Sequence, residues 1–440
     1  MPIFIIAVFF LAACEPVSRP EQQGTDQKLQ LADGKVGQTL VAEYDGLMGV
    51  EIFVRAHAAS TVRYHLQTGP RGTVLAGGET TLQSGTVPGF VRLSFDPQPH
   101  SREISYYFSF ETDNPEPVVV RAAPGATYLN GSAYQNDEPL PDAQLAFRLA
   151  YHPGWMVWGL FKEGIIWLGM LILFGVVYIP PGWVGLSLLW PGWGEQEGVE
   201  KLILSAGVGL VVYPLLLEWT DVFGLRLGAL SAWLPLALAW GYLLWKYPIK
   251  ISPFTFRFPK LDSLTLFLVA GLLFATRFWA IRSLDAPMWG DAFQHTMIAQ
   301  LLVDNGGLFD SWRPYAELST FTYHFGFHTH GAVLHWMTGM PLEEAILWAG
   351  QILNGLAVLG LYPLANKLGG NRWAGIGAVL VAGFLSSMPM FYVNWGRYTQ
   401  LTGQVVLVVI LFVVRDIFSE RRDAWRSCIL IGGLMAGLAL

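Results

Sequence analysis

Apolar runs in the second half of the chain restrict the fold more than any other feature of the sequence. Seven runs approach or reach the ~20 residues that a helix needs to cross a bilayer, and they lie at 164–179, 202–217, 227–244, 264–281, 345–365, 374–393 and 401–414. An eighth run, 429–440, is too short to span, so we expect the chain to be a fragment. Charged residues make up only 14% of the chain, against about 25% in soluble proteins. The sequence therefore predicts a polytopic α-helical membrane domain at 155–440, with about seven spans and a truncated eighth.

Net charge and cysteine content exclude some classes of partner and site. The formal net charge is −6, which argues against nucleic acid as a partner. The two cysteines, Cys14 and Cys428, lie far apart and predict neither a disulfide framework nor a cysteine metal site.

The first residues have the length and composition of an export signal. Residues 1–14 form a short apolar run that ends in Leu11-Ala12-Ala13-Cys14, which resembles a bacterial lipobox with Cys14 as the lipidated residue. No Lys or Arg precedes the run, so an uncleaved signal is the alternative. Both interpretations predict that the following polar segment, 15–34, is an exported linker.

Residues 35–150 have a different pattern. Short runs of alternating apolar and polar residues, separated by Gly, Pro, Asn and Asp, predict an all-β sandwich. The pattern resembles that of jelly-roll, carbohydrate-binding-like modules, so a glycan or polysaccharide is a candidate partner. Tyr106, Tyr107 and Phe108 either line a sugar site or alternate between core and surface.

Loop charges predict the orientation of the membrane domain. If the β domain is outside, the inner loops carry most of the basic residues: Lys246, Lys250, Arg257, Lys260, Lys367, Arg372, Arg415, Arg421, Arg422 and Arg426. The outer connections carry Arg226, Arg282, Arg313 and Arg397 over a greater length. This positive-inside bias predicts a bacterial cell membrane protein whose β domain and loop 282–341 are extracytoplasmic.

The loop at 282–341 carries the most suggestive polar residue. Asp291 lies just past a predicted membrane exit and before a short amphipathic segment. Charged groups are costly near hydrocarbon, so a carboxylate there is a candidate functional residue. The alternative is that Asp291 only caps the following helix.

Histidines in the same loop allow two interpretations. Asp291 and His295 are four residues apart, as are His324 and His328, and each pair would share one face of a helix. Imidazole and carboxylate ligands at this spacing suit a divalent metal near Asp291 and His295. The alternative is that the histidines make hydrogen bonds within an interfacial loop.

A second outer segment, Asn394-Trp-Gly-Arg-Tyr-Thr-Gln400, lies between two spans. Arg397 within it can pair bidentately with a phosphate. The alternative is an aromatic-belt anchor whose arginine reaches toward lipid headgroups.

The run from Trp289 to Gly306 resembles the first outer loop of GT-C membrane glycosyltransferases, in which an acidic residue follows a span and precedes an interfacial helix. The stretches at 323–328 and 395–400 resemble segments of bacterial multi-spanning proteins of this kind. Two departures are that three spans and a β domain come before the span that leads into this loop, and that Gly290 stands where many members carry a second acid.

The resemblance implies a transfer of sugar from a lipid-phosphate-linked donor to an acceptor on the outer face. It implies that Asp291 is the general base and that substrate is bound by His295, Tyr323, His328, Arg397 and Gln400. Membrane lipids are the other expected partners. Two further functions remain open: a transporter or flippase of lipid-linked saccharides, which should bury ionisable residues within its spans, and a non-catalytic membrane-anchored carbohydrate-binding protein.

Overall fold

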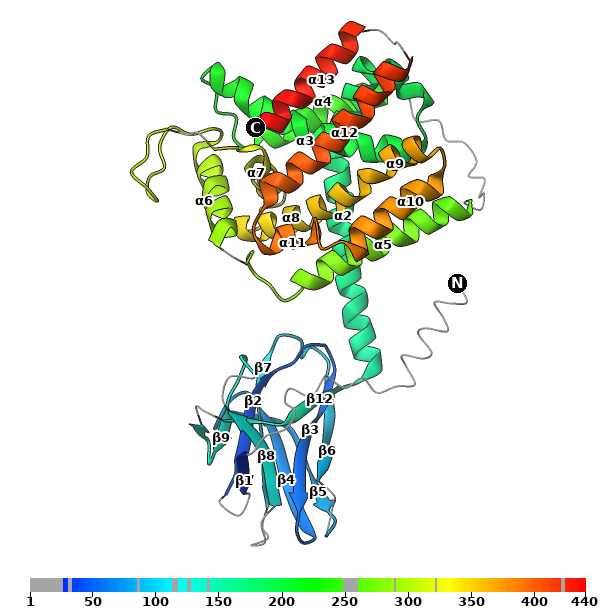
Figure 1. Cartoon of the computed structure of the whole chain (residues 1–440). Helices are drawn as coiled ribbons and strands as arrows, with labels where there is room; N and C mark the ends of the chain where they lie inside the picture. Colours follow the sequence, from blue (N-terminus) through cyan, green and yellow to red (C-terminus); the bar gives the residue numbers. More distant parts are fainter. Residues whose placement is uncertain are drawn as a thin grey trace. The chain divides into compact units, whose positions relative to one another are not determined.

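The computed structural model describes residues 27–30, 34–84, 88–112, 118–124, 128–140, 143–247, 260–288, 290–320, 323–420 and 424–440. The predicted signal 1–14 with Cys14 lies outside these residues, as do Trp289 and the loop residues Lys250, Arg257, Arg421 and Arg422. The chain divides into two compact units, 1–165 and 166–440, and the boundary falls inside a long helix. Figure 1 shows a unit of strands and a unit of helices.

The first unit contains two antiparallel sheets. Their strands are β1 (Gln27–Gln30), β2 (Val36–Val41), β3 (Leu47–Ala56), β4 (Ser60–Gln67), β5 (Val74–Leu82), β6 (Gly89–Gln98), β7 (Ser105–Thr112), β8 (Val118–Pro124), β9 (Ala133–Gln135), β10 (Glu138–Leu140), β11 (Ala143–Leu145) and β12 (Phe147–Tyr151). One sheet has the order β1-β8-β3-β12, with β11 on β8 and β6 on β3, and the other has the order β10-β9-β2-β7-β4-β5. The predicted all-β domain is confirmed.

Alternation of side chains explains how these strands form a sandwich. In β3, Val50, Ile52 and Val54 face the core, whereas Glu51 and Phe53 between them are only partly buried. This is the period-two pattern of a strand with one covered face. The domain also begins earlier than predicted, because β1 lies within the expected linker and pairs with β8 from Gln27 to Gln30.

The aromatic residues of β7 correct one prediction. Tyr106, Tyr107 and Phe108 alternate between the two faces of the strand, as one of the two interpretations predicted, but all three are buried, so none of them lies on the surface or lines an exposed sugar site. Tyr106 and Phe108 belong to the sandwich core. Tyr107 is covered on the other face by Tyr134, whose ring lies 5.1 Å away, and donates a hydrogen bond to Asp137.

The second unit is helical. Its elements are α2 (Pro153–Leu189), which begins in the first unit, η2 (Pro191–Glu195), α3 (Gly198–Val222), α4 (Leu230–Lys246), α5 (Leu261–Ile281), α6 (Gly290–Asn305), α7 (Gly326–Thr338), α8 (Leu342–Leu359), α9 (Leu361–Gly369), α10 (Arg372–Leu380), η3 (Val381–Leu385), α11 (Met390–Asn394), α12 (Tyr398–Glu420) and α13 (Ala424–Ala439).

Among the described residues, six helical stretches are long and apolar enough to cross a membrane: 153–189, 198–222, 261–281, 342–369, 372–394 and 398–418. The protein therefore has the architecture of a multi-pass membrane protein with a β-sandwich domain. The predicted run at 227–244 forms α4, whose 17 residues lie at the lower limit for a membrane span. The run at 429–440 forms most of the shorter apolar helix α13.

Helix α2 continues past the point at which the sequence suggested an end. Its apolar run was expected to stop before Pro180-Pro181, but the helix extends to Leu189. Close packing against α3 accompanies this extension, since a Cβ at Gly209 would lie 1.9 Å from the Tyr178 carbonyl oxygen. Trp190 and Trp193, which follow α2, are buried in a core with α3, α12 and α13.

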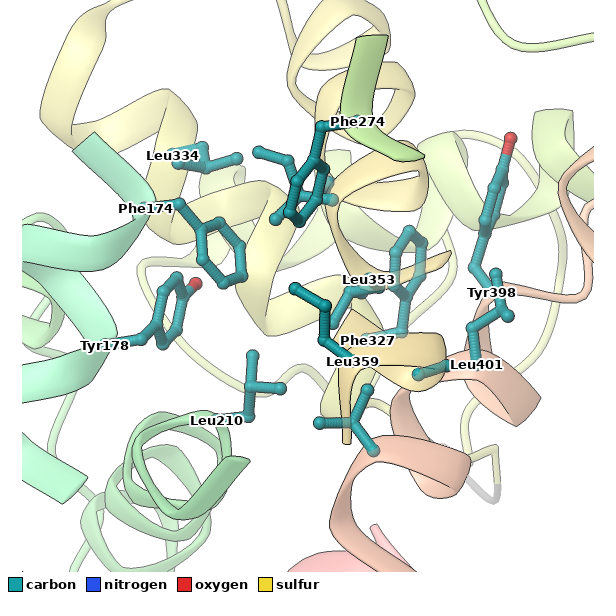
Figure 2. Packing of buried hydrophobic residues seen from close by; sticks show 14 of the residues in the cluster. Phe174, Tyr178, Leu210, Phe274, Phe327, Leu334, Leu353, Leu359, Tyr398 and Leu401 are labelled. Carbon is teal, nitrogen blue, oxygen red and sulfur yellow. The ribbon is translucent and has the colours of Figure 1, made fainter. Parts of the chain in front are cut away.

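The region 282–341, predicted as an outer loop, contains a helix of the bundle interior. Every residue of α7 from Gly326 to Leu334 is buried. Phe327 of α7 lies in the main core together with Phe174, Leu210, Leu353 and other apolar residues (Figure 2). With 13 residues, α7 is too short to span a bilayer. The polar residues around it are therefore held on a packed helix and not on a surface loop.

Candidate functional site

The site forms where the start of α6 meets the turn between α11 and α12. Asp291 is the second residue of α6, which begins at Gly290, so it is not the N-cap residue. Its Oδ2 lies 3.6 Å from Nε of Arg397. The two side chains remain 53% and 50% exposed, so the ion pair is open to a ligand. The structure thus brings together the two residues that the sequence placed in separate outer segments.

Gly396 explains why this contact forms. Its φ of +67° lies in the left-handed region, which glycine adopts without strain. A Cβ at this position would lie 2.6 Å from the Ala292 backbone nitrogen and 3.0 Å from Cβ of Asp291. Only a residue without a side chain allows the turn to pack this closely on the first turn of α6, and this packing places Arg397 beside Asp291.

Two buried histidines lie behind the exposed ion pair. Nδ1 of His295 on α6 is 2.8 Å from Nε2 of His328 on α7, a hydrogen bond in which one ring donates to the other. Nδ1 of His328 is buried and makes no hydrogen bond with the residues that the structure describes. The pair therefore joins α6 to α7 through ring nitrogens removed from solvent.

Burial determines the protonation of this pair. Removal from water lowers the pKa of His295, and this outweighs the raising effects of a hydrogen bond with the Gly396 backbone and of the Asp291 charge. Burial also holds the pKa of His328 well below its usual value, and His295 lowers it further. Both rings are neutral at pH 7, which suits a hydrogen bond between them.

The predicted divalent metal finds no support in this arrangement. Among the residues that the structure describes, no group of three or more His, Cys, Asp or Glu side chains could hold a metal ion. The nitrogens of His295 and His328 that face each other are engaged with one another. The alternative interpretation, in which the histidines make hydrogen bonds, agrees with the geometry.

The other two predicted substrate-binding residues lie at the edge of the site. Tyr323 is exposed, and its ring centre lies 6.2 Å from that of His295 and 5.8 Å from that of His328. Gln400 is the third residue of α12 and lines a cleft of about 280 Å³. Other side chains lining this cleft are His324, Phe327, Thr399 and Thr402.

Aromatic packing links the cleft to the ion pair. The rings of Phe327 and Tyr398 stack with centres 4.8 Å apart, and each contacts the ring of His295. Figure 2 shows both residues at one side of the main core. Because Tyr398 directly follows Arg397, this packing fixes the first turn of α12 beside the site.

One group of polar residues near the site was missed by sequence reasoning. Arg277 on α5 and Asn354 on α8 are buried and bonded to each other, with Nε of Arg277 2.6 Å from Oδ1 of Asn354. Arg277 is the one charged residue of its apolar run, 264–281, and an ionisable residue inside a membrane span is the signal that could have identified the pair.

Neither a scan against protein-family models nor a search of curated proteins gives a match for this chain. Function is therefore argued from the site itself.

Proposed function

We propose that this protein is a GT-C-type membrane glycosyltransferase, which moves a sugar from a lipid-phosphate-linked donor to an acceptor on the extracytoplasmic face. The observation that carries the proposal is the half-exposed Asp291–Arg397 pair, 3.6 Å apart, at the end of a bundle of apolar helices. A carboxylate and a guanidinium in one place supply the two groups that such a transfer needs.

The chemistry assigns one role to each residue. Asp291 removes the proton of the acceptor hydroxyl as its oxygen attacks the anomeric carbon of the donor sugar. The bond between that carbon and the phosphate oxygen breaks, and the phosphate leaves with the electron pair. Arg397 holds the phosphate through two parallel N–H···O bonds while negative charge develops on it. Donor binding would exchange the contact with Asp291 for a contact with phosphate and leave the carboxylate free to act as base.

The cleft beside the pair supports a sugar as the group transferred. Its volume of about 280 Å³ lies near the lower end of the range for ligand sites. Thr399, Gln400 and Thr402 offer hydroxyl and amide groups, and Leu438 adds apolar surface. Such neutral hydrogen-bonding groups around an apolar surface suit the hydroxyls and ring of a saccharide.

A transfer assay tests this proposal. The full chain in lipid nanodiscs is incubated with polyprenyl-phosphate sugars that are radiolabelled in the sugar, with and without candidate acceptors. Release or transfer of labelled sugar that requires Asp291 is the expected result. Intact donor in all reactions, from protein that remains folded, would reject the proposal.

Orientation is part of the proposal and has its own test. Single cysteines replace Lys260 and Ser311 in a chain lacking Cys14 and Cys428, and a membrane-impermeant thiol reagent is added to intact cells. Labelling at position 311 and not at 260 is expected, because the loop charges place the Asp291 end outside. The reverse pattern would move the site to the cytoplasmic face.

One observation favours a second candidate function, transport of a lipid-linked saccharide. Arg277, His328 and His330 are buried within the helical unit, and ionisable residues in such places mark transport pathways in many membrane proteins. Proteoliposomes loaded with labelled lipid-linked sugar separate the two functions. Movement of intact donor between leaflets without cleavage would support the transporter.

A further inference from the structure

Arg277 is a buried cation in a helix that is apolar enough to cross a membrane. Its side chain is on α5 and is 3% exposed. Among the described residues, no carboxylate lies within ion-pair distance of it. Placing a charge in such surroundings is costly, and it is tolerated where the group binds polar partners that serve a function.

The partners of Arg277 are dipoles on two other helices. Nε donates to Oδ1 of Asn354 on α8 at 2.6 Å. Nη2 donates to the carbonyl of Gly383 at 2.9 Å. Gly383 belongs to η3, which continues α10, so the guanidinium lies where the carbonyls of a helix end are left without intrahelical partners. A cation at the C-terminal end of a helix is favoured by the helix dipole.

Asn354 extends the network further along the same segment. Its Oδ1 accepts from Arg277, and its Nδ2 donates to the carbonyl of Pro389 at 2.7 Å. Arg277 and Asn354 therefore bind both ends of 383–389, the segment in which the helix stops and the chain turns into α11. Backbone hydrogen bonds also hold this segment, from Ser386 to Val381, from Phe391 to Ser387 and from Tyr392 to Pro389. The two side chains add the bonds that tie both of its ends to α5 and α8.

The segment 383–389 leads directly to the site. Helix α11 follows it over five residues, and the turn at 395–397 then packs on α6 and carries Arg397 to Asp291. We propose that Arg277 and Asn354 are positioning residues, which hold 383–389 so that Arg397 reaches its place beside Asp291. The conformational part of this inference stands alone, and only its effect on transfer rests on the proposed function.

Packing between α5 and α8 does not by itself require these polar groups. Gly355 lies against the ring of Phe274, and the rings of Phe278 and Trp348 are 5.1 Å apart. These apolar contacts join the two helices on either side of the polar pair. Loss of the pair should therefore release the segment 383–397 while α5 and α8 remain packed.

Distance measurement by electron paramagnetic resonance tests the conformational part. Spin labels are placed at Asn394 and at Leu368, an exposed residue of α9, in the full chain lacking Cys14 and Cys428 and reconstituted in nanodiscs. The parent should give one narrow distance distribution. Arg277→Lys and Asn354→Ala should each broaden it, because an ammonium lacks the fork and alanine lacks both amide groups.

Arg226→Lys is the matched control, since it makes the same chemical change in a partly exposed ion pair with Asp221. It should leave the distribution narrow. If Arg277→Lys does not yield folded protein, Asn354→Ala decides, since it retains the cation and its bond to Gly383. Narrow distributions in the folded Arg277 and Asn354 variants would overturn the inference, whatever the result of the transfer assay.

A double-mutant cycle tests the consequence for Arg397. Arg277→Lys should lower kcat/KM for the lipid-phosphate donor by about 10-fold, and by no more than Arg397→Lys does, because it acts through the placement of Arg397. Added to Arg397→Lys, it should cost much less, because the group it positions is already impaired. Fully additive losses would show that Arg277 acts on something other than Arg397 and would reject the positioning role.

Discussion

The two ends of the helical unit neutralise their charges in different ways. At one end, Arg372 at the start of α10 contacts Glu197 through Nη2 and Asp262 through Nη1, both at 2.8 Å. At the other end, Arg397 makes a single 3.6 Å contact with Asp291, and both side chains are half exposed. The guanidinium of Arg372 is thus bound by two carboxylates at hydrogen-bonding distance, whereas that of Arg397 makes one longer contact that is exposed to solvent.

Other polar residues extend this contrast. Asp416, which is buried, accepts a hydrogen bond from Trp190 at 3.0 Å and lies 3.8 Å from Lys367. Glu200 accepts a hydrogen bond from Asn366 at 2.7 Å. These contacts join α3, α9 and α12 at the Arg372 end. At the Asp291 end, by contrast, Arg277 has only neutral partners.

This difference distinguishes charged residues that stabilise the fold from charged residues that are available to bind a ligand. A cation bound by two carboxylates at hydrogen-bonding distance has little capacity left for a ligand, and its loss leaves acids without a partner. A long, exposed ion pair contributes little to stability and can be exchanged for a substrate at low cost. This contrast is why we propose the Asp291 end as the functional end and regard the Arg372 end as structural.

The largest expected effect is that of Asp291→Asn on sugar transfer. The amide keeps the size of the side chain but cannot accept the acceptor's proton, and loss of a general base typically lowers the rate by ~10²–10⁴-fold. The measurement is initial transfer rate in nanodiscs. Asp285→Asn, six residues earlier in the chain, is the control and should retain activity. Transfer by the Asp291 variant within a few-fold of the parent would show that this carboxylate is not the base.

Arg397→Lys should have the next largest effect. An ammonium keeps the charge but cannot form two parallel bonds to a phosphate. A charge-assisted hydrogen bond contributes about 1.5–3 kcal/mol, so the KM for the donor should rise by roughly 10–100-fold. Measured with a soluble acceptor at saturation, an unchanged donor KM would place the phosphate elsewhere in the site.

The free energy of unfolding should depend more on the Arg372 end than on the Asp291 end, which is the opposite of the order expected for activity. Arg372→Gln removes a cation whose side chain is 25% exposed and leaves Glu197 and Asp262 unpaired, so it should cost about 1–2 kcal/mol of unfolding free energy. Arg397→Gln breaks an exposed pair and should cost less than about 0.5 kcal/mol. Denaturant unfolding in detergent measures both. Equal losses at the two ends would contradict the proposed division between them.

The histidine pair predicts a smaller effect that depends on pH. The pKa values of His295 and His328 are lowered in the folded protein, so below about pH 6.5 the unfolded chain binds protons that the folded chain does not. Stability is therefore full above that pH and falls as the pH decreases from 7 to 5.5. Unfolding of His328→Gln across this range should show a weaker pH dependence than the parent. An identical dependence would place the titrating group elsewhere.

The sequence by itself determined the two-part architecture. Alternation with period two in residues such as Val50, Ile52 and Val54 specifies strands with one covered face, because successive side chains point to opposite sides of a strand. Long apolar runs specify helices, because lipid offers no partners for backbone N–H and C=O groups. Asp291 and Arg397 were also visible as candidates, since charged residues next to membrane spans are conspicuous.

The tertiary structure decided which of these residues meet. No local pattern shows that Arg397 lies beside Asp291, which depends on the positive φ of Gly396 and on the packing of its turn against α6. Helix α7 became part of the interior because apolar neighbours cover it on all sides, and a run of histidines gave no sign of this. Arg277 and Asn354 are 77 residues apart in sequence. Hydropathy and periodicity describe one segment at a time, whereas a site is made of contacts between segments, and only packing in three dimensions selects those contacts.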